Sequence, residues 1–364
     1  MHIDPYSIPL DFVIEDVPER VGGELRSVAG RSGAKIAVNR IGNSRAGLPL
    51  WGYRFGSGTR HVSITAGAHA DEPAGPMAAV AFSRWLISDS RGQELLRDFT
   101  FFVCPQINPD GAAANCAWFS DPADPFAYFQ NVIRELPGDD IEFGYPEPKN
   151  WSKLAPACSM PPRPENIAVA GFLEQGAPFH LHGSLHGMAF AEGAWFLIGR
   201  DWVGESASFQ AIMAAEAAVR NLPLHDIERH GEKGFHRIAP GFCTTPTCTA
   251  MREYFLSQND VDTAGLFRPS SMEYVQSLGG DPRVMVTEMP IFLIDGAQTR
   301  SNPPGPDTAY TRFRASLVSA RALAGPNRTE ALRKLLQAYH LRPVPFSTQV
   351  GMILTAIVAA LESR

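Results

Sequence analysis

The sequence predicts an α/β fold in which a mixed, mostly parallel sheet is flanked by helices. The main observation is an alternation along the chain, because short apolar runs typical of buried strands are followed by segments with apolar residues at helical spacing. A second observation is that Gly and Pro cluster between these runs and mark turns. A third is that several helical patterns follow Pro303 and Pro304, which predicts a C-terminal helical extension.

The individual elements follow from these patterns. Predicted strands cover residues 35–40, 50–55, 62–66, 99–105, 178–185, 195–198 and 283–288. Predicted helices cover residues 18–20, 77–87, 165–174, 206–221, 271–278, 309–324, 329–339 and 348–361. Residues 112–164 and 222–270 lack a clear period, so we interpret them as functional loop regions. We expect a main domain over residues 1–300 and the helical extension over residues 301–364, packed on it.

The composition excludes several classes of protein. With 364 residues, 45% of them hydrophobic and 19% charged, the chain has the composition of an ordinary soluble globular protein. A net charge of −6 provides no basic field for nucleic acid or for an anionic membrane. The five scattered cysteines predict neither a disulfide framework nor a cysteine-based zinc site. No signal peptide or membrane-spanning stretch is recognisable, so we expect a cytoplasmic protein.

The first candidate site lies between a predicted strand and a predicted helix. His69 and Glu72 follow the apolar run Val62 to Ala66 and precede the helical pattern that begins at Met77. At such a turn the ends of an open α/β sheet expose side chains to a crevice. Imidazole and carboxylate suit Zn²⁺, and a catalytic zinc site takes three protein ligands. The pair therefore predicts a zinc site that needs one further ligand, although a surface histidine beside solvated acids would look the same.

Further motifs follow in an order that makes the chain resemble the zinc carboxypeptidases of the carboxypeptidase A type. The resemblance covers roughly residues 35–295. It rests on Ile41-Gly42-x-Ser44-x-x-Gly47-x-Pro49-Leu50, His69-x-x-Glu72, Asn108-Pro109-Asp110-Gly111, Ser184-x-His186 and Val286-Thr287-Glu288. Each motif alone is weak, but five in the same order are specific.

The resemblance implies a role for each matching residue. It makes His69, Glu72 and His186 the ligands of one zinc ion per chain, and the set His₂Glu is known for carboxypeptidase A. It makes Glu288 the general base that takes a proton from the attacking water. It makes Asp140 the acid that orients the first histidine through its second ring nitrogen.

The third ligand has rivals on the same strand. His180, His182 and His186 are spaced evenly, so a strand would direct all three to one face. His186 lies at the offset from the preceding helix that the resemblance implies, and it carries the small-apolar-His pattern. His182 stays open as the alternative ligand, and otherwise His180 and His182 are packed or supporting histidines.

The departures from the family concern substrate binding. Where the family has an Asn-Arg pair that binds the terminal carboxylate, this chain has Glu142 and Phe143. We expect Glu142 to meet a positive group, which is either a substrate amine or Arg134 or Arg268. The family's oxyanion-polarising arginine and its mobile tyrosine are also missing at the expected places. A shift in the alignment by a few residues would provide another explanation.

These observations predict a zinc-dependent hydrolase of an amide or peptide bond, whose substrate lacks the usual recognition of a free C-terminal carboxylate. One alternative is a conventional metallocarboxypeptidase or a deacylase of small N-acyl amino acids. Another is a zinc-binding homologue without catalysis, although Glu288 argues against it. The expected partner is a small-molecule or peptide substrate, with no nucleic acid and no membrane, and a homo-oligomer stays open.

Overall fold

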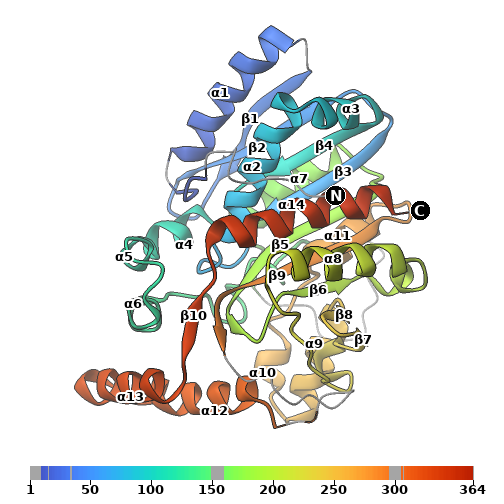
Figure 1. Cartoon of the computed structure of the whole chain (residues 1–364). Coiled ribbons are helices and arrows are strands. Elements are labelled where there is room, and N and C mark those ends of the chain that lie inside the picture. The colour runs from blue at the N-terminus through green and yellow to red at the C-terminus, as the bar shows by residue number, and fades with distance from the viewer. Residues whose placement is uncertain are drawn as a thin grey trace.

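The computed structural model describes residues 10–14, 16–32, 35–148, 160–294, 305 and 307–363. A ten-stranded sheet runs through the middle of this part of the chain (Figure 1). The strands are β1 (Ile36–Asn43), β2 (Pro49–Gly56), β3 (Arg60–Ala66), β4 (Phe99–Cys104), β5 (Leu181–Ala191), β6 (Trp195–Ile198), β7 (Arg237–Ala239), β8 (Phe242–Thr244), β9 (Arg283–Ile294) and β10 (Leu341–Pro343).

Helices connect and cover these strands. They are α1 (Val17–Ser32), α2 (Ala74–Ser88), α3 (Ser90–Asp98), α4 (Pro109–Ala114), α5 (Cys116–Phe119), α6 (Pro125–Asn131), α7 (Pro164–Glu174), α8 (Ala207–Val219), α9 (Cys248–Ser257), α10 (Val261–Ala264), α11 (Ser271–Ser277), α12 (Ala309–Arg321), α13 (Gly325–Ala338) and α14 (Phe346–Glu362). Two 3₁₀ turns, η2 (Arg200–Glu205) and η3 (Glu232–Gly234), complete the described elements.

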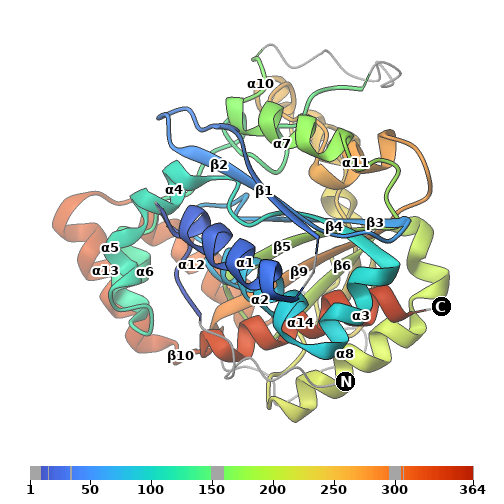
Figure 2. The ribbon, with the colours of Figure 1, turned by 90° about the horizontal axis from the view of Figure 1, so that it is seen from above.

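The sheet is mixed, with the order β1-β2-β4-β3-β5-β9-β6-β8-β7 and with β10 paired to β9. The four central strands β4, β3, β5 and β9 are parallel, whereas β1, β2 and β6 join them through antiparallel pairings. Viewed from above, α2, α8 and α14 cover one face of the sheet and α7 and α11 cover the other (Figure 2). The predicted mixed sheet with helices on its faces and with C-terminal helices is therefore confirmed.

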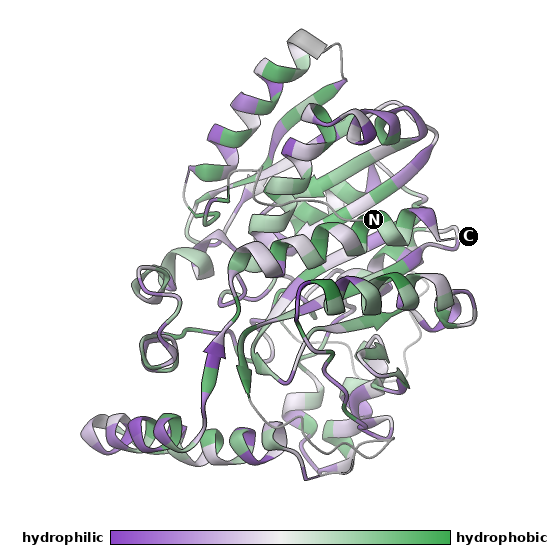
Figure 3. Ribbon diagram, in the orientation of Figure 1, coloured by the Kyte–Doolittle hydropathy of each residue, from purple (hydrophilic) through white to green (hydrophobic). Residues whose placement is uncertain are grey.

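Two apolar layers hold the sheet between its helices. On one face α14 packs against α2 and α8, and Phe82, Met285 and Ile353 belong to the same buried cluster. On the other face Phe102 of β4 lies in a cluster with Phe172 of α7. Figure 3 shows this distribution, because the central strands are hydrophobic along most of their length whereas α13 carries many hydrophilic residues.

The parallel register brings the end of β3 beside the middle of β5 and β9. Ala66, the last residue of β3, is paired with Leu185 of β5, and the next residue, His186, is paired with Glu288 of β9. Gly67 follows β3 with a φ of +79°, and a Cβ there would lie 2.1 Å from Oε1 of Gln106. Only glycine fits such a turn without strain. The turn directs the chain toward α2, so the residues that follow it lie beside the middle of β5.

The C-terminal part returns to the sheet. β10 pairs antiparallel with the last residues of β9, and α14 then runs across one face between α2 and α8. The predicted extension thus contains a short strand that the sequence pattern did not indicate. Among the described residues no helix combines the length and the apolar character that crossing a membrane requires.

Several elements were not predicted. α1 extends over 16 residues where the pattern indicated a short helix, and α3 was missed altogether. The first predicted loop region contains the end of α4 and all of α5 and α6, and the second contains β7, β8, α9 and α10. Residues 149–159 of the first region lie outside the described part of the chain.

Candidate metal centre

Three side chains from two separate parts of the chain lie close together. His69 and Glu72 come from the turn between β3 and α2, and His186 comes from β5. One candidate ligand atom of each lies within 4.8 Å of those of the other two. Nδ1 of His186 is 3.0 Å from Nδ1 of His69 and 2.9 Å from Oε2 of Glu72, and Nδ1 of His69 is 2.9 Å from Oε1 of Glu72.

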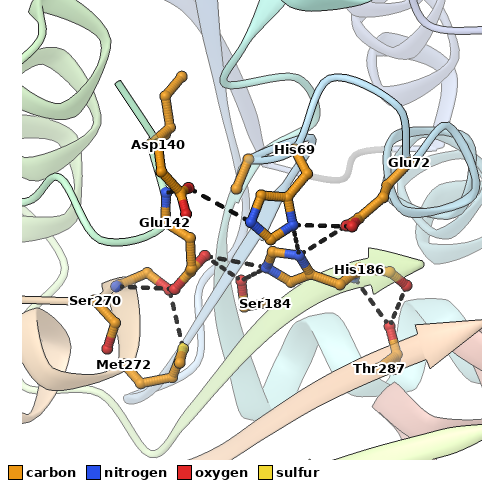
Figure 4. Close-up of polar contacts among 12 residues, drawn as sticks. His69, Glu72, Asp140, Glu142, Ser184, His186, Ser270, Met272 and Thr287 are labelled. Carbon is orange, nitrogen blue, oxygen red and sulfur yellow. Dashed lines mark hydrogen bonds and ion pairs between the residues drawn. The ribbon is translucent and has the colours of Figure 1, made fainter. Parts of the chain in front are cut away.

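The far side of each imidazole faces a carboxylate. Nε2 of His69 lies 3.4 Å from Oδ1 of Asp140, and Nε2 of His186 lies 3.0 Å from Oε2 of Glu142. Figure 4 shows Glu72 on one side of the two rings and Asp140 and Glu142 on the other. An ionised carboxylate only accepts hydrogen bonds, so each Nε2 donates, and in a neutral ring Nδ1 is then the nitrogen that can bind a metal.

This donor set fits a divalent cation. Two Nδ1 lone pairs and the Glu72 carboxylate point at one another, and such an arrangement of acceptors needs a positive charge between them. The raised histidine pKa values reflect the same need for positive charge, because without a cation a second proton on each ring provides it. Burial and Arg134 lower the pKa of His69, but Glu72 and Asp140 outweigh them and raise it to about 9. Burial lowers the pKa of His186, but Glu142 and Glu72 raise it well above its usual value.

Glu288 completes one side of the site. It is paired with His186 in the register of β5 and β9, and it is partly exposed. Burial and the charge of Glu72 raise the pKa of its carboxyl to about 8, although His186, His69 and Arg134 act in the opposite direction. A partly exposed carboxyl beside the ligand group is placed to exchange a proton with a water molecule there.

Arg134 lies on the other side of Glu72. Its Nη1 is 2.8 Å from Oε1 of Glu72 and 3.2 Å from Oδ1 of Asp71, and its side chain is 44% exposed. Asp71 also accepts a hydrogen bond of 2.6 Å from the Tyr128 hydroxyl. The guanidinium is therefore held at the site with much of its surface accessible. Of the two predicted substrate-binding arginines, Arg134 is the one that the structure brings to the candidate metal ligands.

The contacts of Glu142 differ from the predicted ones. It is 4% exposed, and its Oε1 accepts from the Ser271 backbone N–H (3.2 Å) and hydroxyl (2.8 Å). Its Oε2 accepts from the Ser184 hydroxyl (3.2 Å) and from His186. Burial raises the pKa of Glu142, but the bonds from His186 and Ser271 outweigh it and the pKa is lowered. The partner of Glu142 is thus His186, one of the candidate metal ligands, rather than an arginine.

The other substrate-binding predictions also need correction. Phe143 is buried and packs edge-on against Phe267 at 5.6 Å, so its ring belongs to a small core cluster. Arg268 donates to the carbonyl of Met160, while its backbone N–H donates to the carbonyl of Phe143. Arg268 was one of the positive groups that we expected to pair with Glu142. The oxygens of Glu142 instead accept hydrogen bonds from Ser184, His186 and Ser271.

The rival histidines lie apart from the ligand group. His182 is fully buried, with Nδ1 2.9 Å from the Ser63 hydroxyl and Nε2 3.1 Å from the Ser271 hydroxyl. Burial lowers its pKa to about 4, so the ring is neutral. The ring of His180 packs near Phe99 at 6.0 Å. His182 is therefore a supporting residue that reaches Glu142 through Ser271.

The turn at Asn108 is tied to the turn at Ser44 by hydrogen bonds. Asp110 of the Asn108-Pro109-Asp110-Gly111 turn accepts hydrogen bonds from the Ser44 hydroxyl (2.5 Å) and the Ala46 backbone N–H (2.9 Å). Sequence reasoning missed Ser184, Ser271 and Asp71. Asp71 stands beside Glu72 in the sequence, but no spacing indicated that Ser271 would meet Glu142.

A separate cavity of about 440 Å³ lies near the start of β3, at the end opposite to the metal ligands. Lys35, Arg54 and His61 contribute to its lining. A smaller pocket adjoins the site itself and is lined in part by His69, Glu72 and Phe119. The chemistry of the ligand group, rather than cavity size, identifies the functional site.

Comparison with known families agrees with this geometry. Residues 24–122 match the model of the zinc carboxypeptidase family. This part of the chain is similar to the zinc carboxypeptidases. The matched part includes His69, Glu72 and the turn at Asn108, whereas Asp140, His186 and Glu288 lie beyond it. A search of curated proteins finds no significant match.

Several solved structures are similar to this chain, and one of them, a carboxypeptidase A, shares its fold. Carboxypeptidase A from Helicoverpa armigera is 13% identical, with a TM-score of 0.50 over 95% of this chain and 73% of that one. Bovine thrombin-activatable fibrinolysis inhibitor, in complex with tick carboxypeptidase inhibitor, is 14% identical, with a TM-score of 0.48 over 90% and 98%. A metallo-carboxypeptidase from Burkholderia cenocepacia is 14% identical, with a TM-score of 0.45 over 94% and 69%.

Proposed function

We propose that this protein is a zinc-dependent hydrolase of amide or peptide bonds. The observation that carries the proposal is the convergence of the lone pairs of His69 and His186 with the Glu72 carboxylate, beside the partly exposed Glu288. These three residues would hold one zinc ion. When bound, zinc acts as a Lewis acid that polarises a carbonyl and makes water more acidic.

The residues around the ligands have distinct tasks in this proposal. Glu288 takes a proton from the attacking water and delivers it to the leaving nitrogen, a task that its place beside His186 and its partial exposure favour. Arg134 donates to the carbonyl oxygen of the substrate, where negative charge develops during attack. Its position beside Glu72 and its exposed surface support this role. Asp140 keeps the His69 ring in place through Nε2.

The metal requirement is the direct test. We expect close to one zinc per chain, and we expect His69→Ala and His186→Ala to lose it, because two remaining ligands cannot complete the coordination sphere. His182→Ala should keep its zinc, since the His182 nitrogens bond to Ser63 and Ser271. Metal analysis after gel filtration, with peptide hydrolysis before and after chelation, measures both. Zinc loss in His182→Ala with retention in His186→Ala would contradict the ligand assignment.

The substrate is proposed to lack recognition of a free C-terminal carboxylate. The two positions where the family binds that carboxylate hold the buried Glu142 and Phe143, which face other protein groups. We therefore expect a peptide with an amidated C-terminus to be hydrolysed with a kcat/KM within about tenfold of that for the free acid. A preference for the free acid beyond tenfold, equal to about 1.4 kcal/mol of transition-state binding, would favour a conventional metallocarboxypeptidase.

A further inference from the structure

The segment between Gly138 and Gly144 directs two acids at two different metal-ligand histidines. Asp140 reaches Nε2 of His69, and Glu142, two residues further, reaches Nε2 of His186. The backbone N–H of Glu142 donates to Oδ1 of Asp140 at 2.9 Å, so the two acids are fixed relative to each other. Between them Ile141 is fully buried, and its carbonyl accepts from the Asn166 side chain at 2.7 Å.

We propose that Glu142 is a positioning residue for the third metal ligand and sets the zinc affinity of the site, instead of contacting substrate. The inference rests on the proposed zinc-dependent function and extends it to a residue outside the ligand set. An acid that accepts the Nε2–H of a metal-bound histidine fixes its ring and tautomer and makes its other nitrogen a better ligand. His186 then receives from Glu142 the support that His69 receives from Asp140 (Figure 4).

The surroundings of Glu142 are built for a carboxylate with two acceptor oxygens. Oε1 accepts only from Ser271, through its backbone N–H and its hydroxyl, and Oε2 accepts from Ser184 and His186. A glutamine at this position has one acceptor oxygen and one donating amide. Whichever way that amide is turned, it opposes either the Ser271 N–H or the His186 Nε2–H. Glutamine therefore keeps the shape and size of the side chain but cannot satisfy both sides.

A buried chain of hydrogen bonds holds this arrangement from behind. The Ser63 hydroxyl meets Nδ1 of His182, and Nε2 of His182 meets the Ser271 hydroxyl, which donates to Glu142. The chain crosses from β3 through β5 to the start of α11. All of its members are almost fully buried, so the carboxylate cannot turn toward a substrate without breaking several bonds.

The test compares zinc affinity in wild-type protein and in Glu142→Gln by competition with a coloured chelator. The expected result is a 10- to 100-fold weaker zinc affinity in the variant, as for other acids that support a ligand histidine. Glu142→Asp retains both acceptor oxygens on a shorter side chain and should recover part of that loss. Glu273→Gln is the matched control, because Glu273 is a largely buried acid on α11 that accepts from the Ser270 and Cys248 backbone N–H groups.

The control should lose stability without losing zinc affinity, and melting of the metal-free proteins separates the two effects. Wild-type zinc affinity in Glu142→Gln, or a raised KM for cationic substrates with unchanged zinc binding, would overturn the inference and restore a substrate role. An equal loss of affinity in Glu273→Gln would also overturn it. If the wild-type chain itself bound no zinc, the proposed function would fall together with the inference, so the two failures are distinguishable.

Discussion

Glu288 projects from the middle of β9 at the position paired with His186, and it is the acid that we assign as the base. Its carboxyl is not tied into the arrangement of acids that orients the two imidazoles. Burial and the neighbouring Glu72 charge favour its neutral form and raise its pKa to about 8. A bound cation would act in the opposite direction and favour the carboxylate, which is the form that accepts a proton.

Glu288→Gln is expected to keep zinc and fold but to lower kcat by about 10²–10⁴-fold, because an amide cannot accept the proton of the attacking water. Zinc content and melting temperature should match those of the wild type, since Glu288 lies outside the ligand group. Turnover of a chromogenic peptide amide provides the rate. An unchanged kcat in a variant that holds its zinc would remove Glu288 from the mechanism.

Single residues differ in how far the sequence could predict them. His69 and Glu72 are three positions apart, so one turn brings them together and the local pattern was enough. Glu142 was misplaced because its partners Ser184 and Ser271 lie 42 and 129 positions away. Only the register of distant elements decides whether a buried acid meets a histidine, an arginine or a substrate. Spacing along the chain does not carry that information.

At the level of elements, the site depends on how closely α2 approaches β5. A Cβ on Gly75 would lie 2.1 Å from the carbonyl oxygen of Leu185, the residue before His186. The first turn of α2 therefore rests directly on the backbone of β5, and this contact sets the separation between Glu72 and His186. Packing of backbone against backbone leaves no side chain that could move aside.

Gly75→Ala is expected to destabilise the protein by about 1–3 kcal/mol, as overpacking in a tight core does, and to weaken zinc binding by moving Glu72. Gly171→Ala is the control, since an added Cβ there meets nothing within 4 Å on the exposed side of α7. It should stabilise by roughly 0.5–1 kcal/mol, because alanine favours a helix over glycine. Urea unfolding and zinc titration of both variants check this, and equal stability of the two would contradict the close contact.

Elements were predictable where a long period or a buried run defined them. β3, β4 and β6 are short buried strands bounded by turn signals, so their limits agree with the pattern to within about two residues. α1 contains Gly22, Gly23 and Gly30, which lower helix propensity and hid its length. α5 has four residues and β10 has three, and neither is long enough to show a period.

For the whole molecule, the important feature is that the C-terminal part belongs to the common core. Thirteen of the 17 residues of α14 are buried, and ten of them belong to one apolar cluster with residues of α2 and β9. Residues on both sides of position 300 therefore share one hydrophobic core. This shared core predicts that residues 1–300 do not fold alone.

A chain that stops after residue 300 is expected not to form a stable fold, because it exposes the apolar faces of α2 and α8 that α14 covers. Circular dichroism melting and limited proteolysis of the truncated and full chains measure this. A chain that stops after residue 340 serves as a second variant, since it retains α12 and α13 and lacks only β10 and α14. Cooperative melting of either truncated chain at the temperature of the full chain would contradict the expectation.

The position of α14 also determines the order in which the protein can be completed during synthesis. The candidate metal ligands have left the ribosome once residue 186 is outside, yet the face of the sheet that carries α2 lacks its cover until residue 362 has followed. While the residues between 186 and 362 are being synthesised, α2 exposes apolar side chains such as Phe82 and Ile87 that α14 has not yet covered. Surfaces of this kind bind chaperones or one another. Metal loading of the nascent chain is thus expected to follow, rather than precede, the arrival of α14.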